Sequence, residues 1–266
     1  MTTAATDSNE SRHRILEGVL LRLARVPDAG AFILRGGLLM RHWFRPVRRP
    51  ADDVDLIATF PFDVEEAARR FLPVLADAAV ADGVTFDPDR TRVASIRLNT
   101  DTPGVRVFAT GTARGDETDF NVDVTFGPIP RPAPVLGDIP MACGEVARLW
   151  VCRPEAIAGQ KVQALRFRSA LGWRPKDLND LRLLTRLPMD RAELRRAIAA
   201  YLADVGGTLD DARALFGPES WWGAKFSAAR WRDFAEASCG QDVPRSLEAV
   251  VAEVAGRLVP VLEDAP

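Results

Sequence analysis

Two acidic residues in a short motif have the type and spacing that metal chemistry needs. Asp53 and Asp55 are separated by one residue in the run Ala51-Asp-Asp-Val-Asp-Leu56. Side chains two positions apart in a strand project from the same face, so both carboxylates would lie side by side. Like charges at that spacing repel each other unless a cation lies between them. A divalent cation would relieve this repulsion, although DxD motifs also arise by chance at strand ends.

A third carboxylate lies in a later apolar segment. Asp123 is placed between Val122 and Val124 in a sequence that is otherwise typical of a buried strand. An acidic side chain is unfavourable there without a partner, unless the strand is at an edge and the residue faces water. If this strand lies beside the strand of Asp53 and Asp55, the three carboxylates converge on one metal-binding patch.

The metal at such a patch would be magnesium or manganese. The chain has only two histidines and three scattered cysteines, which is too few for a zinc site of the usual kind or a disulfide framework. Carboxylate oxygens are the ligands that magnesium and manganese prefer. The low cysteine content also predicts a reducing compartment, and we expect a cytoplasmic protein.

A pair of glycines precedes the acidic motif. Gly36 and Gly37 follow the short apolar run at residues 31–34, which is typical of a buried strand. Glycine lets backbone amides approach a phosphate closely. A di-glycine, a DxD motif and a lone strand aspartate occur together by accident far less often than any one of them alone.

The elements that must position these residues form an α/β half followed by a helical half. Alternating apolar residues predict antiparallel strands between residues 84 and 126, and five prolines predict a loop at 127–140. The fold class is therefore α+β, with domains at 1–150 and 151–266. Further strands are expected at 54–60 and 146–152, and helices at 12–26, 38–44, 63–81, 155–171, 176–187, 191–205 and 245–262.

One lysine lies on the apolar stripe of the helix expected at 155–171. Lys161 shares that stripe with Ile157 and Leu165. An ammonium group there needs an anionic partner, which a phosphate or Asp177 of the next helix could supply. Alternatively, the lysine extends its amine into water from the edge of the stripe.

The order of these motifs resembles that of the DNA polymerase β-like nucleotidyltransferase superfamily. Two further segments, PEAIAGQKVQAL at 154–165 and RPKDLNDL at 174–181, are similar to signatures of the AbiEii/AbiGii toxin family, which includes the MenT-type toxins. The similarity extends over roughly residues 32–187. It implies a polymerase β-like nucleotidyltransferase domain with a mixed or antiparallel sheet, followed by a helical C-terminal domain.

The resemblance also implies a role for each matched residue. Asp53 and Asp55 would hold magnesium and a nucleoside triphosphate. Asp123 matches the third carboxylate, a base or metal ligand near the attacking hydroxyl. Lys161 matches the lysine that meets the triphosphate, and Asp177 matches the carboxylate of an Arg-Asp pair. Enzymes of this type transfer a nucleotide onto nucleic acid, tRNA acceptor ends in the MenT toxins, and an antitoxin protein is the implied partner.

Two positions depart from the family pattern. Leu38 and Ala51 stand where relatives carry Ser or Thr, whose hydroxyls could bind phosphate. We expect Gly36, Gly37 and Arg35 to contribute to nucleotide binding, with Lys161, and the metal ligands to be retained. The departures leave open a degenerate module that binds a nucleotide without turnover.

The acceptor is less well defined than the metal site. Arginines between the glycines and the aspartates form either a phosphate-binding track or a solvated loop. A net charge of −2 and a pI of 5.8 argue against a generally basic RNA binder and keep a protein or small-molecule acceptor open. No apolar run of membrane-spanning length and no signal peptide is expected. The arginines between the glycines and the aspartates are Arg35, Arg41, Arg45, Arg48 and Arg49, and they are interleaved with His42, Trp43 and Phe44. The C-terminal tryptophans, Trp221, Trp222 and Trp231, are instead expected to pack in the core.

Overall fold

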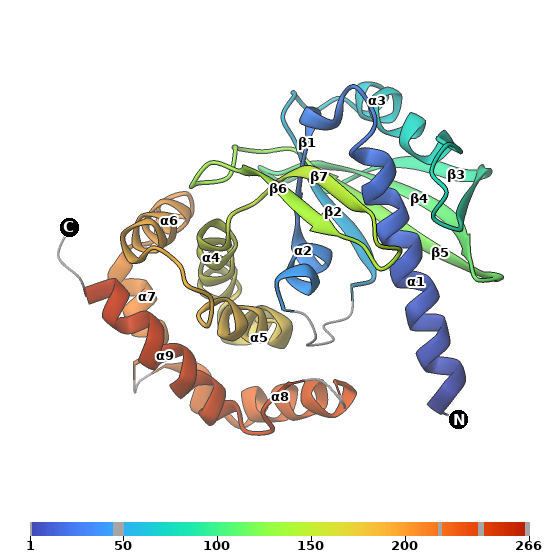
Figure 1. Cartoon of the computed structure of the whole chain (residues 1–266). Coiled ribbons are helices and arrows are strands. Elements are labelled where there is room, and N and C mark those ends of the chain that lie inside the picture. Colours follow the sequence, from blue (N-terminus) through green and yellow to red (C-terminus); the bar gives the residue numbers. More distant parts are fainter. Residues whose placement is uncertain (1, 45–50, 218–219, 239–241, 264–266) are drawn as a thin grey trace. The chain divides into compact units, whose positions relative to one another are not determined.

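A computed structural model of the chain describes residues 2–44, 51–217, 220–238 and 242–263, with side chains from residue 9 onward except at position 221 (Figure 1). The chain divides into two compact units. The first contains the residues up to Cys152 apart from Pro130–Ala133, and the second contains that segment and the residues from Arg153 onward. That the two halves are independently folding domains stays a prediction.

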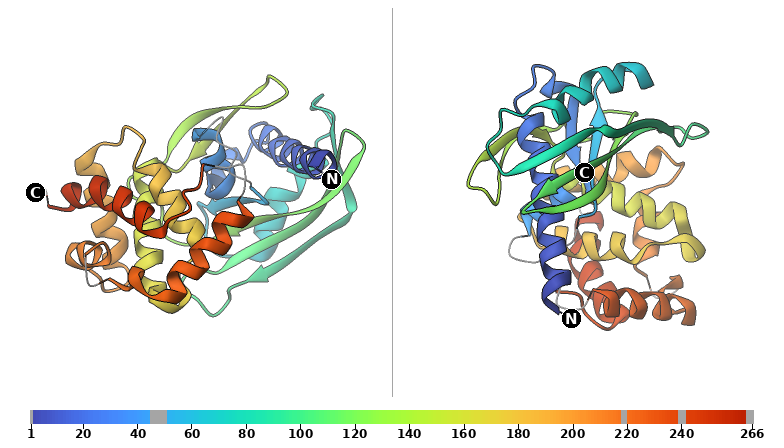
Figure 2. Two further views of the ribbon diagram at one scale, coloured as in Figure 1. Left: turned by 90° about the horizontal axis from the view of Figure 1, so that it is seen from below. Right: turned by 90° about the vertical axis from the view of Figure 1, so that its right-hand side faces the viewer.

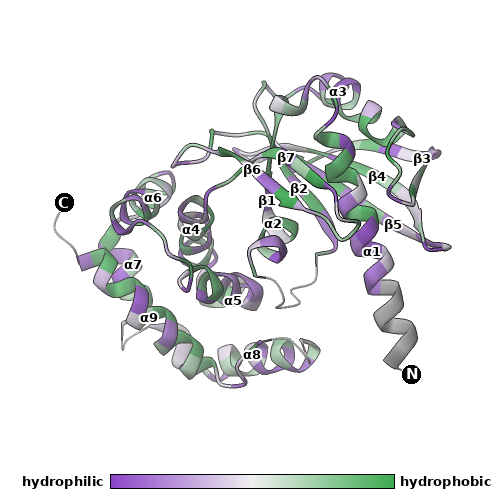
Figure 3. Cartoon of the chain, viewed as in Figure 1, coloured by the Kyte–Doolittle hydropathy of each residue, from purple (hydrophilic) through white to green (hydrophobic). Residues whose placement is uncertain are grey.

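The first unit is built on a seven-stranded mixed sheet in the order β3-β4-β5-β2-β1-β7-β6. The pairs β2–β5 and β1–β7 are parallel, and the other neighbours are antiparallel. Hydrophobic residues concentrate in the strands (Figure 3). The strands are β1 (Phe32–Arg35), β2 (Asp53–Ala58), β3 (Val84–Ile96), β4 (Gly104–Ala113), β5 (Asp116–Thr125), β6 (Val135–Pro140) and β7 (Val146–Val151).

Three helices accompany this sheet: α1 (Thr2–Leu23), α2 (Gly36–Trp43) and α3 (Val64–Ala76). Helix α1 runs along one face of the sheet (Figures 1 and 2), and a Cβ on Gly111 of β4 would lie 2.7 Å from the Ile15 side chain of α1. Alternate strand residues such as Val107 and Val122 are buried on that face. Near the carboxylates the core therefore takes alternate residues of β4 and β5, whereas β1 is buried on both faces at Phe32, Ile33 and Leu34.

A buried ion pair joins α1 to the turn before β3. Arg22 is 2% exposed and contacts Asp82 at 2.7 Å. Its guanidinium also donates to the carbonyl oxygens of Gly18, Asp77 and Val84. Because every buried donor has an acceptor, this arginine can lie in the interior without an unpaired polar group.

The second unit is helical. Trp222 and Trp231 are buried, and their indole N–H groups donate to the carbonyl oxygens of Leu215 and Pro244. The predicted packing of these two tryptophans is confirmed, and the side chain of Trp221 lies outside the described residues. The helices are α4 (Pro154–Gly172), α5 (Pro175–Leu184), α6 (Arg191–Ala203), α7 (Leu209–Leu215), α8 (Lys225–Ala237) and α9 (Leu247–Glu263). None of the described helices of either unit is both long and apolar enough to cross a membrane.

Several predicted boundaries were wrong. Helix α1 spans Thr2–Leu23 instead of 12–26, and α3 ends at Ala76 instead of 81. The early end of α3 follows from Asp77, whose backbone is extended and whose side chain accepts from the N–H of Ala79. The predicted start of α3 is confirmed, because Asp63 accepts from the N–H of Glu66.

The predicted loop at 127–140 was also wrong in its last part. Residues Val135–Pro140 form strand β6, which pairs antiparallel with β7 at the edge of the sheet. An edge strand tolerates a proline, since the missing N–H faces no ladder partner. Helices α7 and α8 were not predicted individually, and the predicted loop at 45–50 lies outside the described residues.

Candidate metal centre

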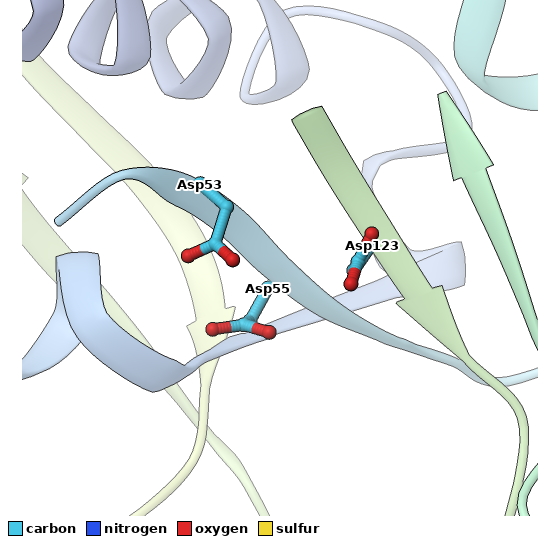
Figure 4. A group of neighbouring side chains, drawn as sticks. All are labelled: Asp53, Asp55 and Asp123. Atoms are coloured by element: carbon cyan, nitrogen blue, oxygen red, sulfur yellow. The ribbon is translucent and has the colours of Figure 1, made fainter. Parts of the chain in front are cut away.

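Three carboxylates meet on two neighbouring strands. Strand β2 pairs parallel with β5, with Asp55 opposite Asp123 and Asp53 opposite Asn121. Each of the three aspartates offers an oxygen atom within 4.8 Å of the others (Figure 4). The predicted adjacency of the two strands is confirmed. An all-oxygen donor set this compact suits magnesium or manganese, so the residues present fit such an ion.

The core fixes the backbone that carries these carboxylates. Val54, Leu56 and Val124 alternate with the aspartates and are fully buried. Their packing holds the two strands in register and turns the acidic side chains toward the opposite face. Asp123 is only 8% exposed, whereas Asp53 and Asp55 are half-buried.

An arginine that sequence reasoning missed holds the third carboxylate. Arg106 of β4 lies opposite Asp123 in the β4–β5 register. Its Nε donates to Oδ1 at 2.6 Å and its Nη2 to Oδ2 at 2.7 Å, which is a two-point contact. The hydrogen bonds to Asp123, together with the charges of Asp123, Asp53 and Asp55, raise the pKa of Arg106 above its ordinary value. Only the register between β4 and β5 reveals this pair, because the two residues are far apart in the sequence.

Asp55 differs from Asp123 in its surroundings. In the part of the chain that the structure describes, no donor or cation contacts the Asp55 carboxylate, while Arg106 engages both oxygens of Asp123. The Asp55 oxygens therefore point into the cluster without a protein partner. This is the electrostatic situation that a bound divalent cation would relieve.

The di-glycine lies directly against the cluster. Gly36 has φ +74°, and a Cβ at this position would be 1.9 Å from Oδ2 of Asp55. Only glycine fits, because both the backbone conformation and the space exclude a side chain. Helix α2 begins at Gly36, so its first N–H groups start beside Asp55. Gly37 is buried in the first turn of α2, and Arg35 of β1 lies opposite Asp55 in register.

The two positions that depart from the family pattern are both buried. Leu38 is 4% exposed and Ala51 is 2% exposed. Both side chains lack a hydroxyl that could bind phosphate, and their apolar atoms are removed from water. The departures are therefore consistent with the local packing and leave the three carboxylates unchanged.

Lys161 and Asp177 lie together in the second unit. The Nζ atom of Lys161 on α4 is 2.6 Å from Oδ1 of Asp177 and 2.8 Å from Oδ2 of Asp180, both on α5. Of the partners considered from the sequence, Asp177 is the one present. The contact of Lys161 with Asp180 was not predicted from the sequence. The three-residue spacing of the two aspartates, which puts both on one helix face, was the available signal.

The predicted arginine track is only partly described. Arg35 ends β1, and Arg41, His42 and Trp43 belong to the last turns of α2. Phe44 directly follows α2 and is buried. Arg45, Arg48 and Arg49 lie outside the described residues, so the track stays a prediction.

Solved structures show the fold. JHP933 from Helicobacter pylori aligns with a TM-score of 0.53 and 14% identity, over 95% of this chain and 90% of that one. A second H. pylori protein, assigned as a nucleotidyltransferase, aligns with a TM-score of 0.55 and 12% identity, over 97% and 96%. The fold is therefore nucleotidyltransferase-like. No curated protein matches this chain.

A sequence profile of one family covers most of the chain. The family is described as nucleotidyl transferase AbiEii toxin of a type IV toxin–antitoxin system, and it matches residues 18–253. This range includes the di-glycine, all three clustered aspartates and the Lys161–Asp177 pair. The chain belongs to the AbiEii family of nucleotidyl transferase toxins.

Proposed function

We propose that the protein transfers a nucleotide from a nucleoside triphosphate to an acceptor hydroxyl, at the 3′ end of a tRNA or another RNA. The observation that carries this proposal is the compact cluster of Asp53, Asp55 and Asp123 beside the Gly36 turn. Two divalent ions would supply the charge that activates the acceptor and stabilises the leaving group. We further propose a cytoplasmic location and, from the family, an antitoxin partner.

The reaction places a distinct demand on each group. The acceptor oxygen bonds to the α-phosphorus, the bond from that phosphorus to the oxygen bridging to the β-phosphate breaks, and pyrophosphate leaves with the electron pair. The hydroxyl proton passes to Asp123 or to water. Asp53 and Asp55 would hold magnesium or manganese against the triphosphate.

Charge on the triphosphate needs neutralising donors. The N–H groups at the start of α2, at Gly36 and Gly37, are suited to phosphate oxygens, and Arg35 adds a positive charge on the adjoining strand. Lys161 stays a proposed triphosphate ligand on the resemblance alone, since its ammonium group is bound by Asp177 and Asp180. Asp177 is accordingly proposed to position that lysine.

A labelling assay tests the proposal. Purified protein, magnesium and each of the four α-labelled nucleoside triphosphates are incubated with total RNA. We expect label in RNA, and a loss of about 1000-fold or more with Asp55→Asn, by analogy with removal of a group that stabilises transition-state charge. Asp52→Asn is the matched control, because Asp52 is exposed and lies outside the cluster. An absence of transfer with every nucleotide, to any acceptor, would contradict the proposal.

A protein or small hydroxyl compound is the second candidate acceptor. The formal net charge of −2 favours it, since generally basic surfaces are typical of proteins that bind nucleic acid. Labelling a cell extract and then digesting with ribonuclease or protease separates these acceptors. A degenerate binding module, which Leu38 and Ala51 motivate, would instead raise its melting temperature with nucleotide and yield no product.

A further inference from the structure

An aromatic ring lies between two arginines on the sheet face that carries the carboxylates. The register places Arg106 of β4 opposite Asp123, and places Phe108 opposite both Asn121 of β5 and Arg92 of β3. Residues directly opposite each other in a sheet share a face, and so do residues two apart in a strand. Proceeding outward from Asp123, this face therefore carries Arg106, then Phe108, then Arg92.

Both arginines lie within cation–π distance of the Phe108 ring, and Arg92 is the nearer of the two. The guanidinium carbon of Arg92 is 4.0 Å from the centroid of the Phe108 ring, and that of Arg106 is 5.9 Å away. Arg92 is exposed, and Phe108 and Arg106 are half-buried. The core takes the alternate residues of β4, Val105 and Val107, so Phe108 is an aromatic side chain on the polar side of the sheet.

The arginines of β3 differ in their partners. Arg90 is paired with Glu117 and Asp119 of β5. Within the described residues, Arg92 forms no ion pair, and its only recorded contact is with the Phe108 ring. Its guanidinium therefore offers a flat cation that no carboxylate of the described ranges contacts.

We propose that Arg92, Phe108 and Arg106, the stacking platform, bind the terminal nucleotide of a single-stranded nucleic-acid acceptor. The base would stack on the exposed side of the Arg92 guanidinium, which the Phe108 ring supports from the other side at 4.0 Å, and the phosphodiester would contact Arg92. Planar aromatic and guanidinium groups are the surfaces on which unpaired bases stack. This inference rests on the proposed nucleotidyl transfer and assigns its acceptor side.

The order of the strands supports an acceptor over the nucleoside triphosphate. Gly36 and the start of α2 adjoin the β1–β2 side of the carboxylates, whereas the platform adjoins the β5–β4 side. In phosphoryl transfer the attacking and leaving oxygens lie roughly in line, on opposite sides of the phosphorus. If the phosphates lie at the Gly36 turn, the attacking hydroxyl approaches from the side of the platform.

Binding measured apart from transfer tests the platform. A short fluorescein-labelled single-stranded RNA ending in CCA is titrated with wild-type protein, Phe108→Leu, Phe108→Trp and Arg92→Gln, and anisotropy is recorded. We expect about tenfold weaker binding for Phe108→Leu and for Arg92→Gln, with retention in Phe108→Trp. Arg92→Gln should also lower the salt dependence by about one phosphate contact. Arg148→Gln is the matched control, because Arg148 is an exposed arginine of the first unit on β7, across the sheet from β3.

The outcomes separate this inference from the proposed function. Normal RNA binding by both Phe108→Leu and Arg92→Gln, with transfer still abolished in Asp55→Asn, overturns the platform and leaves the proposed function standing. If the wild-type protein shows no transfer but binds RNA, and Phe108→Leu weakens that binding, the platform is supported and the proposed function is contradicted. If Phe108→Leu weakens binding of the nucleoside triphosphate as much as it weakens binding of RNA, the ring belongs to the triphosphate site and the inference is overturned. Should Phe108→Leu fail to fold, Phe108→Trp and Arg92→Gln decide the matter.

Discussion

Carboxylates are buried in both units of the chain, and their partners differ. On α4 and α5 of the second unit, Asp177 and Asp180 close around the ammonium group of Lys161 at 2.6 and 2.8 Å. On β2 and β5 of the first unit, three aspartates gather with oxygens within 4.8 Å of one another. There Arg106 engages Asp123, while within the described chain Asp55 has no such contact.

In the second unit the negative charges are paired with Lys161, whereas in the first unit Arg106 contacts Asp123, one of three clustered carboxylates. A half-buried lysine held by two buried carboxylates balances their charge within the fold, so removing it leaves uncompensated negative charge in the interior. Asp55 faces two other carboxylates and, among the described residues, contacts no cation, so water or an ion from solution would stabilise it. The Lys161–Asp177–Asp180 cluster is therefore expected to govern stability. The cluster of Asp53, Asp55 and Asp123 is expected to govern binding.

After the loss expected for Asp55→Asn, the largest effect concerns the turn that lies against Asp55. We expect Gly36→Ala to reduce transfer by about 100-fold or more, because a methyl group 1.9 Å from Oδ2 must displace the carboxylate. Gly115→Ala is the matched control, since Gly115 has φ +86° and no atom within 4 Å of an added Cβ. It should show only the backbone cost of a positive φ, about 1–2 kcal/mol of unfolding free energy. Transfer rates and manganese affinity measure the contrast, and equal losses in both variants would argue against a role for the Asp55 contact.

The next effect concerns the ion pairs of Lys161 in the second unit. Lys161→Met should lower the free energy of unfolding by about 3–5 kcal/mol, because Asp177 and Asp180 are then buried without a cation. Asp177→Asn should cost less, since Asp180 still pairs with the lysine. Urea unfolding followed by circular dichroism measures both. A Lys161→Met protein as stable as the wild type would show that this cluster does not hold the second unit together.

Between about pH 7.5 and 5, we expect a pH effect on stability from His13 of the first unit. Burial, and then the charges of Arg41 and Arg12, lowers the pKa of His13 to about 4. The unfolded chain, with an ordinary histidine pKa near 6.5, binds more protons than the folded one between about pH 6.5 and 4. Stability from this group is therefore complete above about pH 6.5 and falls with pH, by about 2 kcal/mol between pH 7.5 and 5.

His13→Leu tests this assignment. Neither ring nitrogen of His13 has a hydrogen-bond partner in the described structure, so a leucine loses no such contact. Unfolding free energies across the pH range should lose this dependence in His13→Leu and keep it in His42→Gln. An unchanged slope in His13→Leu would assign the pH dependence to the carboxylates.

The smallest expected effect is on manganese affinity, and it tests whether Arg106 competes with a metal ion for the three carboxylates. Arg106→Met should bind manganese about tenfold more tightly without nucleotide, because a positive charge in contact with Asp123 is removed. Arg92→Gln removes an equal charge from the same sheet face without touching Asp123 and should leave the affinity unchanged. Titration followed by the manganese EPR signal distinguishes the two. Weaker binding in Arg106→Met would mean that Arg106 positions Asp123 for the ion.

The sequence predicted more of this site than of its surroundings. The alternation of valine and aspartate was enough to place Asp53 and Asp55 on one face, because strand periodicity is local. Their convergence with Asp123 depended on the pairing of β2 with β5, which the sequence supplied only as a condition. Arg106 and the Phe108 stack could not be predicted, since they depend on the register between β3, β4 and β5. Strand β6 was hidden by the prolines around it, and the end of α3 was set by a local hydrogen bond of Asp77.

The parallel pairing of β2 with β5 has a consequence for synthesis of the toxin. The two strands are separated along the chain by α3, β3 and β4, so a nascent chain that has emerged only as far as β4 lacks Asp123 altogether. Long-range pairing of this kind forms later than local helices, since the intervening loop must first be closed. The carboxylate cluster thus assembles only in a nearly complete first unit, and a ribosome-bound fragment that ends before β5 cannot form the proposed metal site.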